Sequence, residues 1–355
     1  MKRYLVVAAI LGVLFTKQAS AQDIHFSQFY ENAIFRNPAL TGIFSGDYKA
    51  GVNYRTQWGN ISNPFQTVLA SVESRIAVNP EVGDYISYGV SASYDHAGAI
   101  NFNSLQVYPA VNYNKSLEDK HLSYLSVGFT GGYVQRSVDM NLMTLDNQYV
   151  NGSYNAGNPT GETLNFTKIT HFDLGAGVSF NSSMGPTGKI NYYIGGAVFH
   201  VTKPKESFNE NESFIRLTTK YSGNLGVRWR INQQFGLTVH ANYLNQRPYQ
   251  EIIFGGLLSW KPMVSSVEAS NNKFSIYAGA FLRVKDAVIP TIKIDYKTYS
   301  FTASYDVTTS SLKPSVSSKG GWEFSIYARG VGKKKLDQNK CPRFEGDFDQ
   351  NYENQ

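Results

Sequence analysis

Hydrophobic and polar side chains alternate along most of this 355-residue chain. In the segment GWEFSIYARG, one face of a strand would carry Trp322, Phe324 and Ile326, and the opposite face would carry Glu323 and Arg329. A strand of about ten residues with one apolar and one polar face is typical of a transmembrane β-barrel, whose outer wall meets lipid while its lumen is polar. The pattern therefore predicts strands that separate two different environments.

The same alternation recurs along the whole chain. We expect about fourteen strands, an even number in the range of single-chain membrane barrels. They are predicted to start near Asp47, Thr67, Tyr85, Ser104, Tyr124, Phe172, Asn191, Tyr221, Phe235, Gln250, Phe274, Ala287, Tyr299 and Gly321. The two longest connections, 137–171 and 201–219, fall on the same side of the wall, which is the outer side if the amino terminus is periplasmic. A soluble β-sandwich is the alternative, but it would be unusually large and would not explain the charged residues at mid-strand.

The amino-terminal 21 residues read as a cleaved signal peptide. Lys2 and Arg3 precede an apolar run at 4–15, and Ala19-Ser20-Ala21 supplies small residues for cleavage. A membrane anchor is the alternative reading, but the run is shorter than the ~20 apolar residues that span a bilayer. The chain is thus expected to leave the cytoplasm.

Composition supports strands and turns, since the chain holds 24 Tyr, 22 Phe and 31 Gly. Without the signal peptide the net charge is weakly positive and dispersed, which argues against nucleic acid as a partner. One cysteine, Cys341, cannot form a disulfide framework, so it is either a free thiol or an intermolecular bridge. The predicted divisions are a signal peptide (1–21), an amino-terminal periplasmic segment (22–46), an outer-membrane β-barrel (47–330) and a periplasmic tail (331–355).

The sequence offers little for catalysis. His240 lies near Asn242, but no serine stands beside them as a nucleophile. Asp95-His96 at an outer strand end is an isolated acid–base pair. No cluster has metal-ligand spacing, because a single cysteine cannot build a thiolate site. We therefore expect no enzyme activity, no metal and no cofactor.

The segment after the signal peptide fits neither a helix nor a strand period. It places Phe26, Phe29 and Tyr30 among polar residues and then breaks at Asn37-Pro38, which favours an extended turn into the first strand. We expect a plug or collar at the periplasmic mouth of the barrel, where these residues would pack into the lower lumen or bind a partner. Simple packing under the barrel rim, with no partner, is the alternative.

The first outer loop contains Arg55, Gln57 and Trp58, side chains that often anchor protein interfaces. Folding of this loop over the lumen is the alternative. Charges of both signs fall on predicted lumen positions, where pairing across strands would fill and close the pore, in preference to a selective channel. These residues are Lys49, Arg55, Glu73, Arg75, Arg228, Arg230, Lys293, Asp295, Glu323 and Arg329.

Three blocks of sequence resemble a known family. HFSQFYENAIFRNPALTG at 25–42, YRTQWGNISNPFQTVLASVES at 54–74 and CPRF at 341–344 look like the PorP/SprF family of Bacteroidetes outer-membrane proteins, which is tied to the type IX secretion system. The resemblance implies a barrel without catalytic chemistry. Some members accompany a large secreted surface adhesin, and others sit with periplasmic ring and motor components. This chain differs from the pattern by continuing past CPRF into EGDFDQNYENQ.

From these observations we expect a non-enzymatic outer-membrane barrel of the type IX secretion and gliding system that binds and retains or presents a secreted cell-surface protein. One alternative is a core subunit of the apparatus docked on the periplasmic ring, and another is a diffusion porin for small solutes. The expected partners are the secreted cargo or adhesin, outer-membrane lipid and, in the first alternative, ring components. The expected partner-binding residues are Phe26, Phe29, Tyr30, Asn37, Pro38, Arg55, Gln57, Trp58, Cys341, Pro342, Arg343 and Phe344.

Overall fold

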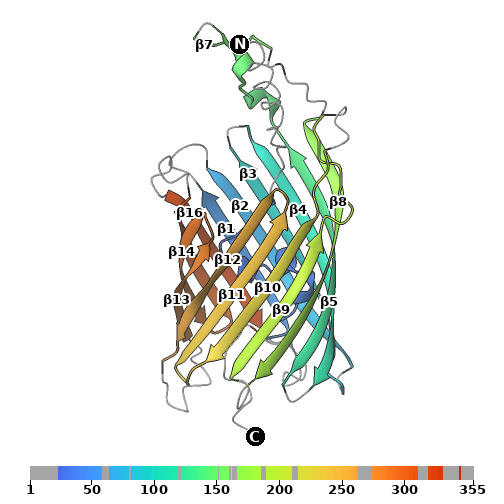
Figure 1. Cartoon of the computed structure of the whole chain (residues 1–355), viewed down its shortest axis with the longest axis vertical. Coiled ribbons are helices and arrows are strands. Elements are labelled where there is room, and N and C mark those ends of the chain that lie inside the picture. The colour runs from blue at the N-terminus through green and yellow to red at the C-terminus, as the bar shows by residue number, and fades with distance from the viewer. Residues whose placement is uncertain are drawn as a thin grey trace, which may run out of the picture.

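The protein is a closed antiparallel β-barrel of fourteen strands (Figure 1). The computed structural model describes residues 23–57, 64–79, 81–98, 100–118, 121–150, 152–159, 161, 166–184, 189–209, 215–262, 274–310, 319–330 and 344. All fourteen strands expected from the alternation are present, and their starts lie within four residues of the predicted positions. The prediction of an antiparallel barrel is therefore confirmed.

The strands follow one another around the wall in sequence order, and β1 pairs with β16 to close it, from Tyr48 opposite Gly330 to Gln57 opposite Gly321. A separate two-stranded hairpin, β6–β7, stands in the connection between β5 and β8. The strands are β1 (Tyr48–Gln57), β2 (Phe65–Asn79), β3 (Asp84–Ala97), β4 (Phe102–Glu118), β5 (Ser123–Ser137), β6 (Tyr149–Val150), β7 (Ser153–Tyr154), β8 (Lys168–Met184), β9 (Ile190–Phe199), β10 (Lys220–Arg230), β11 (Phe235–Gln246), β12 (Tyr249–Trp260), β13 (Phe274–Arg283), β14 (Ala287–Tyr296), β15 (Tyr299–Thr308) and β16 (Lys319–Gly330).

The two faces of the wall differ in the way that the alternation predicts. In β16 the side chains of Trp322, Phe324 and Ile326 point outward and remain 43–49% exposed, whereas Glu323 and Tyr327 point into the lumen and are at most 1% exposed. Apolar side chains on the outer wall of a barrel meet lipid, and polar side chains line the interior. Among the described helices, none is long and apolar enough to cross a membrane.

The two ends of the barrel carry connections of different length. At one end most strands turn within a few residues, as at 231–234 and 297–298, while 261–273 is longer, and β1 begins and β16 ends there. The connections 138–167 and 200–219 lie at the opposite end, and the first of them carries the short helices η3 (Met140–Leu142) and η4 (Asp146–Gln148) and the β6–β7 hairpin well above the wall (Figure 1). Because outer-membrane barrels have short periplasmic turns and longer extracellular loops, we call these the periplasmic end and the outer end.

Candidate functional site

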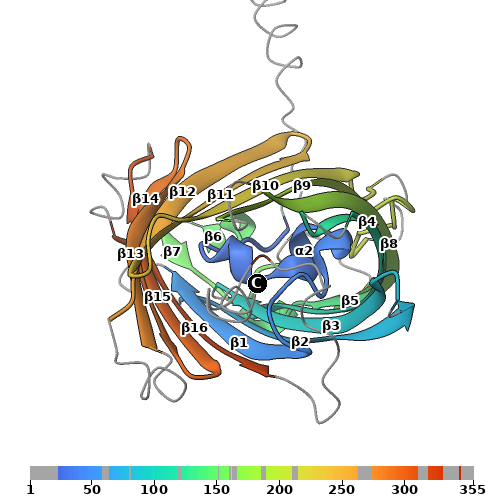
Figure 2. The same cartoon turned by 90° about the horizontal axis from the view of Figure 1, so that it is seen from below.

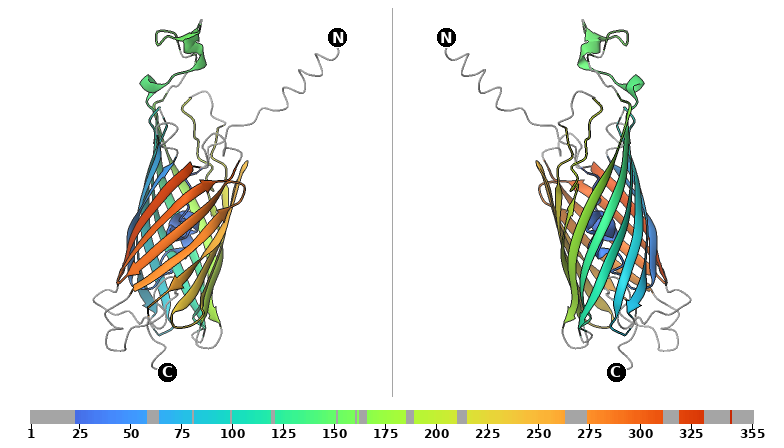
Figure 3. Two further views of the ribbon diagram at one scale, coloured as in Figure 1. Left: turned by 90° about the vertical axis from the view of Figure 1, so that its left-hand side faces the viewer. Right: turned by 90° about the vertical axis from the view of Figure 1, so that its right-hand side faces the viewer.

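The lumen is occupied by the protein's own amino-terminal segment, residues 23–47, which we call the plug (Figures 2 and 3). It contains three short helical turns, η1 (Phe29–Glu31), α2 (Ala33–Arg36) and η2 (Pro38–Leu40). Turns of three or four residues are too short to show a helix period, because one turn of an α-helix already takes 3.6 residues. This is why the sequence of the plug fits no regular pattern.

Aromatic side chains attach the plug to the wall formed by β11–β14. Phe29 and Tyr30 are 6% and 3% exposed and join a buried cluster with Leu257 and Phe281. The Tyr30 ring stacks between His240, with centroids 5.0 Å apart, and Phe281, at 5.1 Å. Full burial of one such ring is worth roughly 1.5–3 kcal/mol relative to water, so the aromatic residues contribute strongly to holding the plug.

The opposite side of the plug packs against β4 and β5. Ile34 is 1% exposed and belongs to a cluster with Tyr108 and Val134. The Phe35 ring meets the Tyr108 ring edge-on, with centroids 5.2 Å apart. Phe26, in the stretch before η1, is 5% exposed. The plug therefore contacts opposite walls of the lumen, and Figure 2 shows it inside the ring of strands.

Asn37 bonds the plug to three strands at once. Its amide nitrogen donates to the carbonyl of Val178 at 3.1 Å, to the carbonyl of Gly196 at 3.3 Å and to the side-chain oxygen of Asn224 at 3.0 Å. Its own side-chain oxygen accepts from the Ala39 amide at 2.9 Å, which caps η2. The side-chain oxygen and nitrogen of Asn37 therefore both have partners, although the residue is 0% exposed.

Glycines in the wall leave room for this part of the plug. A β-carbon at Gly128 would overlap the backbone around Ala39, and one at Gly177 would overlap the side-chain oxygen of Asn37. At Gly195 it would lie 2.8 Å from the Asn37 side-chain nitrogen. A close backbone approach is a common reason for glycine inside a strand. These three glycines form a recess that matches the plug.

Carboxylates of the wall bind the first residues of the plug on the outer side. Glu323 accepts the backbone amides of Ser27 and Gln28 at 2.7 and 3.0 Å. Arg55 pairs with Glu323 at 3.2 Å and with Asp306 at 2.9 Å, so each buried charge has a partner of opposite sign. These ion pairs join wall residues to one another, and the plug adds hydrogen bonds to the same carboxylates.

Asp306 faces the lumen in the regular alternation of β15, on the same face as Thr302 and Ser304. The pairing of β15 with β16 shifts register opposite it, between Tyr305 and Val307. Asp306 points into the lumen, where it also accepts from the Ser27 hydroxyl at 2.5 Å and pairs with Arg283 at 3.1 Å.

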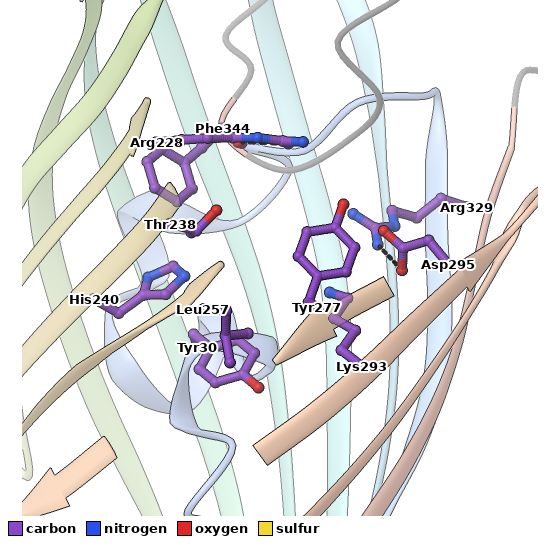
Figure 4. A pocket seen from close by; sticks show the side chains of 10 residues that line it. All are labelled: Tyr30, Arg228, Thr238, His240, Leu257, Tyr277, Lys293, Asp295, Arg329 and Phe344. Carbon is purple, nitrogen blue, oxygen red and sulfur yellow. Dashed lines mark hydrogen bonds and ion pairs between the residues drawn. The ribbon is translucent and has the colours of Figure 1, made fainter. Parts of the chain in front are cut away.

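On the periplasmic side the plug supplies the acid and the wall supplies the bases. Glu31 is 0% exposed and lies 3.1 Å from Lys49 and 2.7 Å from Lys293. Further along the plug, the Gly42 amide donates to Glu73 at 2.9 Å. Of the predicted lumen charges, six are seen in ion pairs, either with the plug or across strands: Lys49, Arg55, Lys293, Asp295, Glu323 and Arg329. Arg75 and Arg228 donate instead to backbone carbonyls, and Figure 4 shows Arg228 beside Phe344, whose carbonyl it binds.

The outer end of the plug is fixed by a buried ion cluster. Asp23 binds His200 at 2.8 Å and Lys220 at 2.6 Å, and His200 also binds Asp173 at 2.8 Å. Burial alone would lower the pKa of His200, but the carboxylates of Asp23 and Asp173 outweigh burial and raise the pKa to about 8. Burial likewise opposes ionisation of Asp23, but Lys220 and His200 hold its pKa well below the usual value.

The plug therefore runs through the lumen from the outer end, at Asp23, to the periplasmic end, where β1 begins at Tyr48. This corrects the prediction of a collar confined to the periplasmic mouth. Asn37-Pro38 does not lead directly into the first strand either, since η2 and a further stretch of plug follow it. The physical reason is that the polar residues of the segment find their charged partners along the whole height of the wall.

The residues expected in the first outer loop occupy different places. Arg55 lies within β1, is 3% exposed and binds the plug through the Ser27 hydroxyl at 2.6 Å. Gln57, the last residue of β1, lines a cavity of about 280 Å³ at the outer end, together with His25 and Arg283. Trp58 lies outside the described residues.

Of the CPRF block, only Phe344 is described. Its side chain is 3% exposed and packs inside the lumen against Leu40 and Ile43 of the plug and Tyr193 of β9. Cys341, Pro342 and Arg343 lie outside the described residues. Phe344, predicted as a partner-binding residue, thus contacts the protein's own plug.

Sequence reasoning missed several residues that hold the plug, among them Asp23, Glu31, Asp173, His200 and Asp306. Glu31 and Asp23 carried one available signal, since they are acids in a segment expected to enter a lumen lined by bases. His200 carried none, because it lies 177 residues from Asp23 in the sequence.

The candidate catalytic groups do not form a catalytic arrangement. Asp95 accepts from the Thr67 hydroxyl at 2.5 Å, while the His96 ring bonds with Asn103 at 2.8 Å. His240 is 2% exposed in the aromatic cluster around Tyr30. In the part of the chain that the structure describes, no group of three or more His, Cys, Asp or Glu side chains is arranged to hold a metal ion.

A closed wall with an apolar outer surface, a polar lumen and a plug defines an outer-membrane β-barrel protein. Residues 18–327 match the family described as type IX secretion system membrane protein PorP/SprF, and the chain belongs to this family. The family is one of secretion-associated membrane proteins and not of enzymes. The protein is accordingly located in the outer membrane.

No curated protein matches the chain. Among solved structures, the toluene transporter TbuX of Ralstonia pickettii is similar over 83% of this chain and 91% of its own, with 11% identity and a TM-score of 0.48. A FadL homologue of Pseudomonas aeruginosa is similar over 83% of this chain and 93% of its own, with 11% identity and a TM-score of 0.44. Similarities this distant carry no argument about transport.

Proposed function

We propose that this barrel binds a secreted protein of the type IX system and retains or presents it at the cell surface. The observation that carries the proposal is the filled lumen: the plug contacts opposite walls and forms ion pairs with the wall at two levels, through Asp23 and Glu31. A barrel filled in this way is poorly suited to the diffusion of solutes. Its two ends are the surfaces that remain for binding proteins.

The outer end offers a raised surface for such a partner. In the β6–β7 hairpin Tyr149 pairs with Tyr154 across the strands, and the two rings are 62% and 47% exposed. Val150 beside them is 48% exposed. Tyrosine is enriched in protein interfaces, because it combines a large apolar ring with a polar group. We propose the hairpin as a contact for the secreted protein.

The expected partner-binding residues receive two roles in this proposal. Those inside the lumen act indirectly, by holding the plug that gives the barrel its closed form; they are Phe26, Phe29, Tyr30, Asn37, Pro38, Arg55 and Phe344. Direct contact with a partner is proposed for Gln57, Trp58, Cys341, Pro342 and Arg343.

The test compares a double variant, Tyr149→Ser with Tyr154→Ser, with the matched control Tyr149→Phe with Tyr154→Phe, which keeps both rings. We expect the serine variant to release the secreted protein from cells into the medium, at least several-fold more than the parent. The phenylalanine control should retain it. Cell-associated and released protein are measured by immunoblot, together with barrel abundance and co-purification of ring components.

Equal retention in both variants would argue against the hairpin as the contact. Loss of ring components with cargo still on the cell, after changes at the periplasmic end, would favour the core-apparatus alternative. A large steady current through the unaltered protein in planar bilayers would favour the porin alternative.

A further inference from the structure

The outer surface of the wall is hollowed over β14, β15, β16 and β1, four strands that are consecutive neighbours in the ladder (Figure 3, left). An open recess of about 490 Å³ follows two successive rungs of this ladder. One rung consists of Tyr54, Phe324, Ala303 and Ile292, and the other consists of Val52, Ile326, Phe301 and Ile294. The recess is therefore lined by apolar side chains of the lipid-facing side.

A small side chain makes the hollow. Ala303 is opposite Ile292 on one side and Phe324 on the other, and Phe301 precedes it on the same face of β15. These three larger side chains are 46–58% exposed and stand out from the wall. The alanine is thus the floor of the recess, and the larger side chains are its borders.

Stacked rings border the recess toward the outer end. The Phe324 ring is nearly parallel to the Trp322 ring, with centroids 5.7 Å apart, and the Trp322 ring lies 4.7 Å from the Tyr305 ring. Trp322 and Tyr305 are opposite one another in the next rung toward the outer end. Because packed aromatic rings hold one another in a fixed geometry, this border is formed before any ligand binds.

Toward the periplasmic end the recess meets an exposed cation. The next rung on this side contains Tyr296 opposite Tyr299, which are 44% and 49% exposed. Lys297 follows in the turn, and its ammonium lies 5.3 Å from the centre of the Tyr296 ring, on the lipid-facing side. In the part of the chain that the structure describes, no carboxylate pairs with Lys297. Tyrosine and lysine are the residues that anchor a barrel at the level of the lipid headgroups.

The depth of the recess matches one leaflet of the membrane. Ile292 is four residues from Tyr296, which corresponds to about 14 Å along an antiparallel strand. A strand tilt of about 40° reduces this to about 10 Å along the membrane normal. Half of the hydrocarbon core measures about 15 Å. The recess therefore lies within the leaflet at the periplasmic end.

We propose that this recess is a binding site for a diacyl glycerophospholipid of the periplasmic leaflet, with one acyl chain over Ala303 and the phosphate at Lys297. A narrow, flexible chain fits a hollow whose floor is a single alanine. The lysine and the recess follow one another in the order in which such a lipid carries its phosphate and its chain. The bound lipid occupies a fixed place on the wall, in contrast to the lipid that exchanges around the rest of it.

The test uses the full-length protein, purified in detergent and freed of lipid. Phosphatidylglycerol is added, and native mass spectrometry counts the lipids that stay bound to each barrel. We expect one retained phosphatidylglycerol, and several-fold less retention of diacylglycerol, which has the same chains and no phosphate. A phosphatidylglycerol with a photoreactive diazirine in its acyl chain should label the peptide that contains Ala303.

Two variants test the two parts of the site. Ala303→Trp fills the hollow and Lys297→Gln removes the charge, and each should reduce retention several-fold. The matched controls should retain the lipid as the parent does. They are Ala280→Trp, at a lipid-facing alanine of β13 outside the recess, and Lys285→Gln, at an exposed lysine that has a positive φ like Lys297 but lies in the turn at the outer end. Slower migration after boiling confirms that each variant is folded, and Lys297→Gln, in an exposed turn, tests the site even if Ala303→Trp does not assemble.

Retention at the parent level in Lys297→Gln and in folded Ala303→Trp would overturn the proposal. So would a preference for lipid A, the lipid of the outer leaflet, because the ligand would then belong to the other leaflet. A dimer in the parent spectrum that Ala303→Trp dissociates would assign the recess to a second copy of the chain and would equally overturn it.

Discussion

Inside the lumen the side chain of Asn37 lies against the bare backbone of Gly177, closer than any β-carbon would permit. The same asparagine bonds to backbone carbonyls of two strands and to the Asn224 side chain. The Asn37 side-chain amide thus couples the plug to the wall. The fit depends on the absence of a β-carbon at Gly177.

Gly177→Val should therefore displace the plug while the wall still forms, since glycine at this position makes no side-chain contact that the wall needs. We expect a measurable rise in single-channel conductance in planar bilayers. Gly131→Val is the matched control, because a β-carbon there would meet only Leu174, at 3.8 Å. Equal conductance of both variants and the parent would argue against the Gly177 recess as a determinant of closure.

At the scale of elements, the plug is held by several separate sets of contacts with the wall. The set at the outer end, around Asp23, is sensitive to pH. Asp23 is bound by His200 and Lys220, and His200 is bound in turn by Asp173. The His200 pKa of about 8 lies above the ordinary value of about 6.5. A raised histidine pKa stabilises the bound state fully below about pH 6.5 and loses this contribution as the pH rises through 8.

We therefore expect the outer end of the plug to loosen between pH 6.5 and about pH 8.5, by about 2 kcal/mol at most. Asp23 acts in the opposite range, since its lowered pKa matters only below about pH 4. Hydrogen exchange of residues 23–28, corrected for the intrinsic effect of pH, should speed up across this window. His200→Gln should exchange quickly at every pH, and a pH response that persists in this variant would contradict the assignment.

For the whole molecule, closure of the ladder and filling of the lumen have separate consequences. All fourteen strands pair on both edges, so the wall has no free edge from which unfolding can begin. The plug and the paired charges occupy the lumen that this wall encloses.

The protein should accordingly migrate faster on a gel when it is left unboiled in mild detergent, and it should show little steady conductance in planar bilayers, well below that of a general porin. Equal mobility with and without boiling would contradict the closed ladder. A large and stable current would contradict the closed lumen, whatever the gel shows.

The sequence by itself determined the wall. Alternation in segments such as GWEFSIYARG identified the strands, because a strand between lipid and a polar lumen has a strict period of two. This period can be recognised in the sequence of one strand, whatever its neighbouring strands are. It also identified inward charges such as Arg55 and Lys293, since the same period assigns each residue to a face. The least accurate prediction was the start of β8, which was expected near Phe172 and lies at Lys168.

Only the tertiary structure decided how the plug and Phe344 occupy the lumen. The Ser27 amide meets Glu323 across 296 residues of sequence, and Arg228 meets Phe344 across 116. Such contacts have no period and no local propensity, because they arise where short irregular segments meet a surface assembled from distant strands. The wall follows from a repeated local rule, whereas the closure of its lumen follows from single long-range matches of shape and charge.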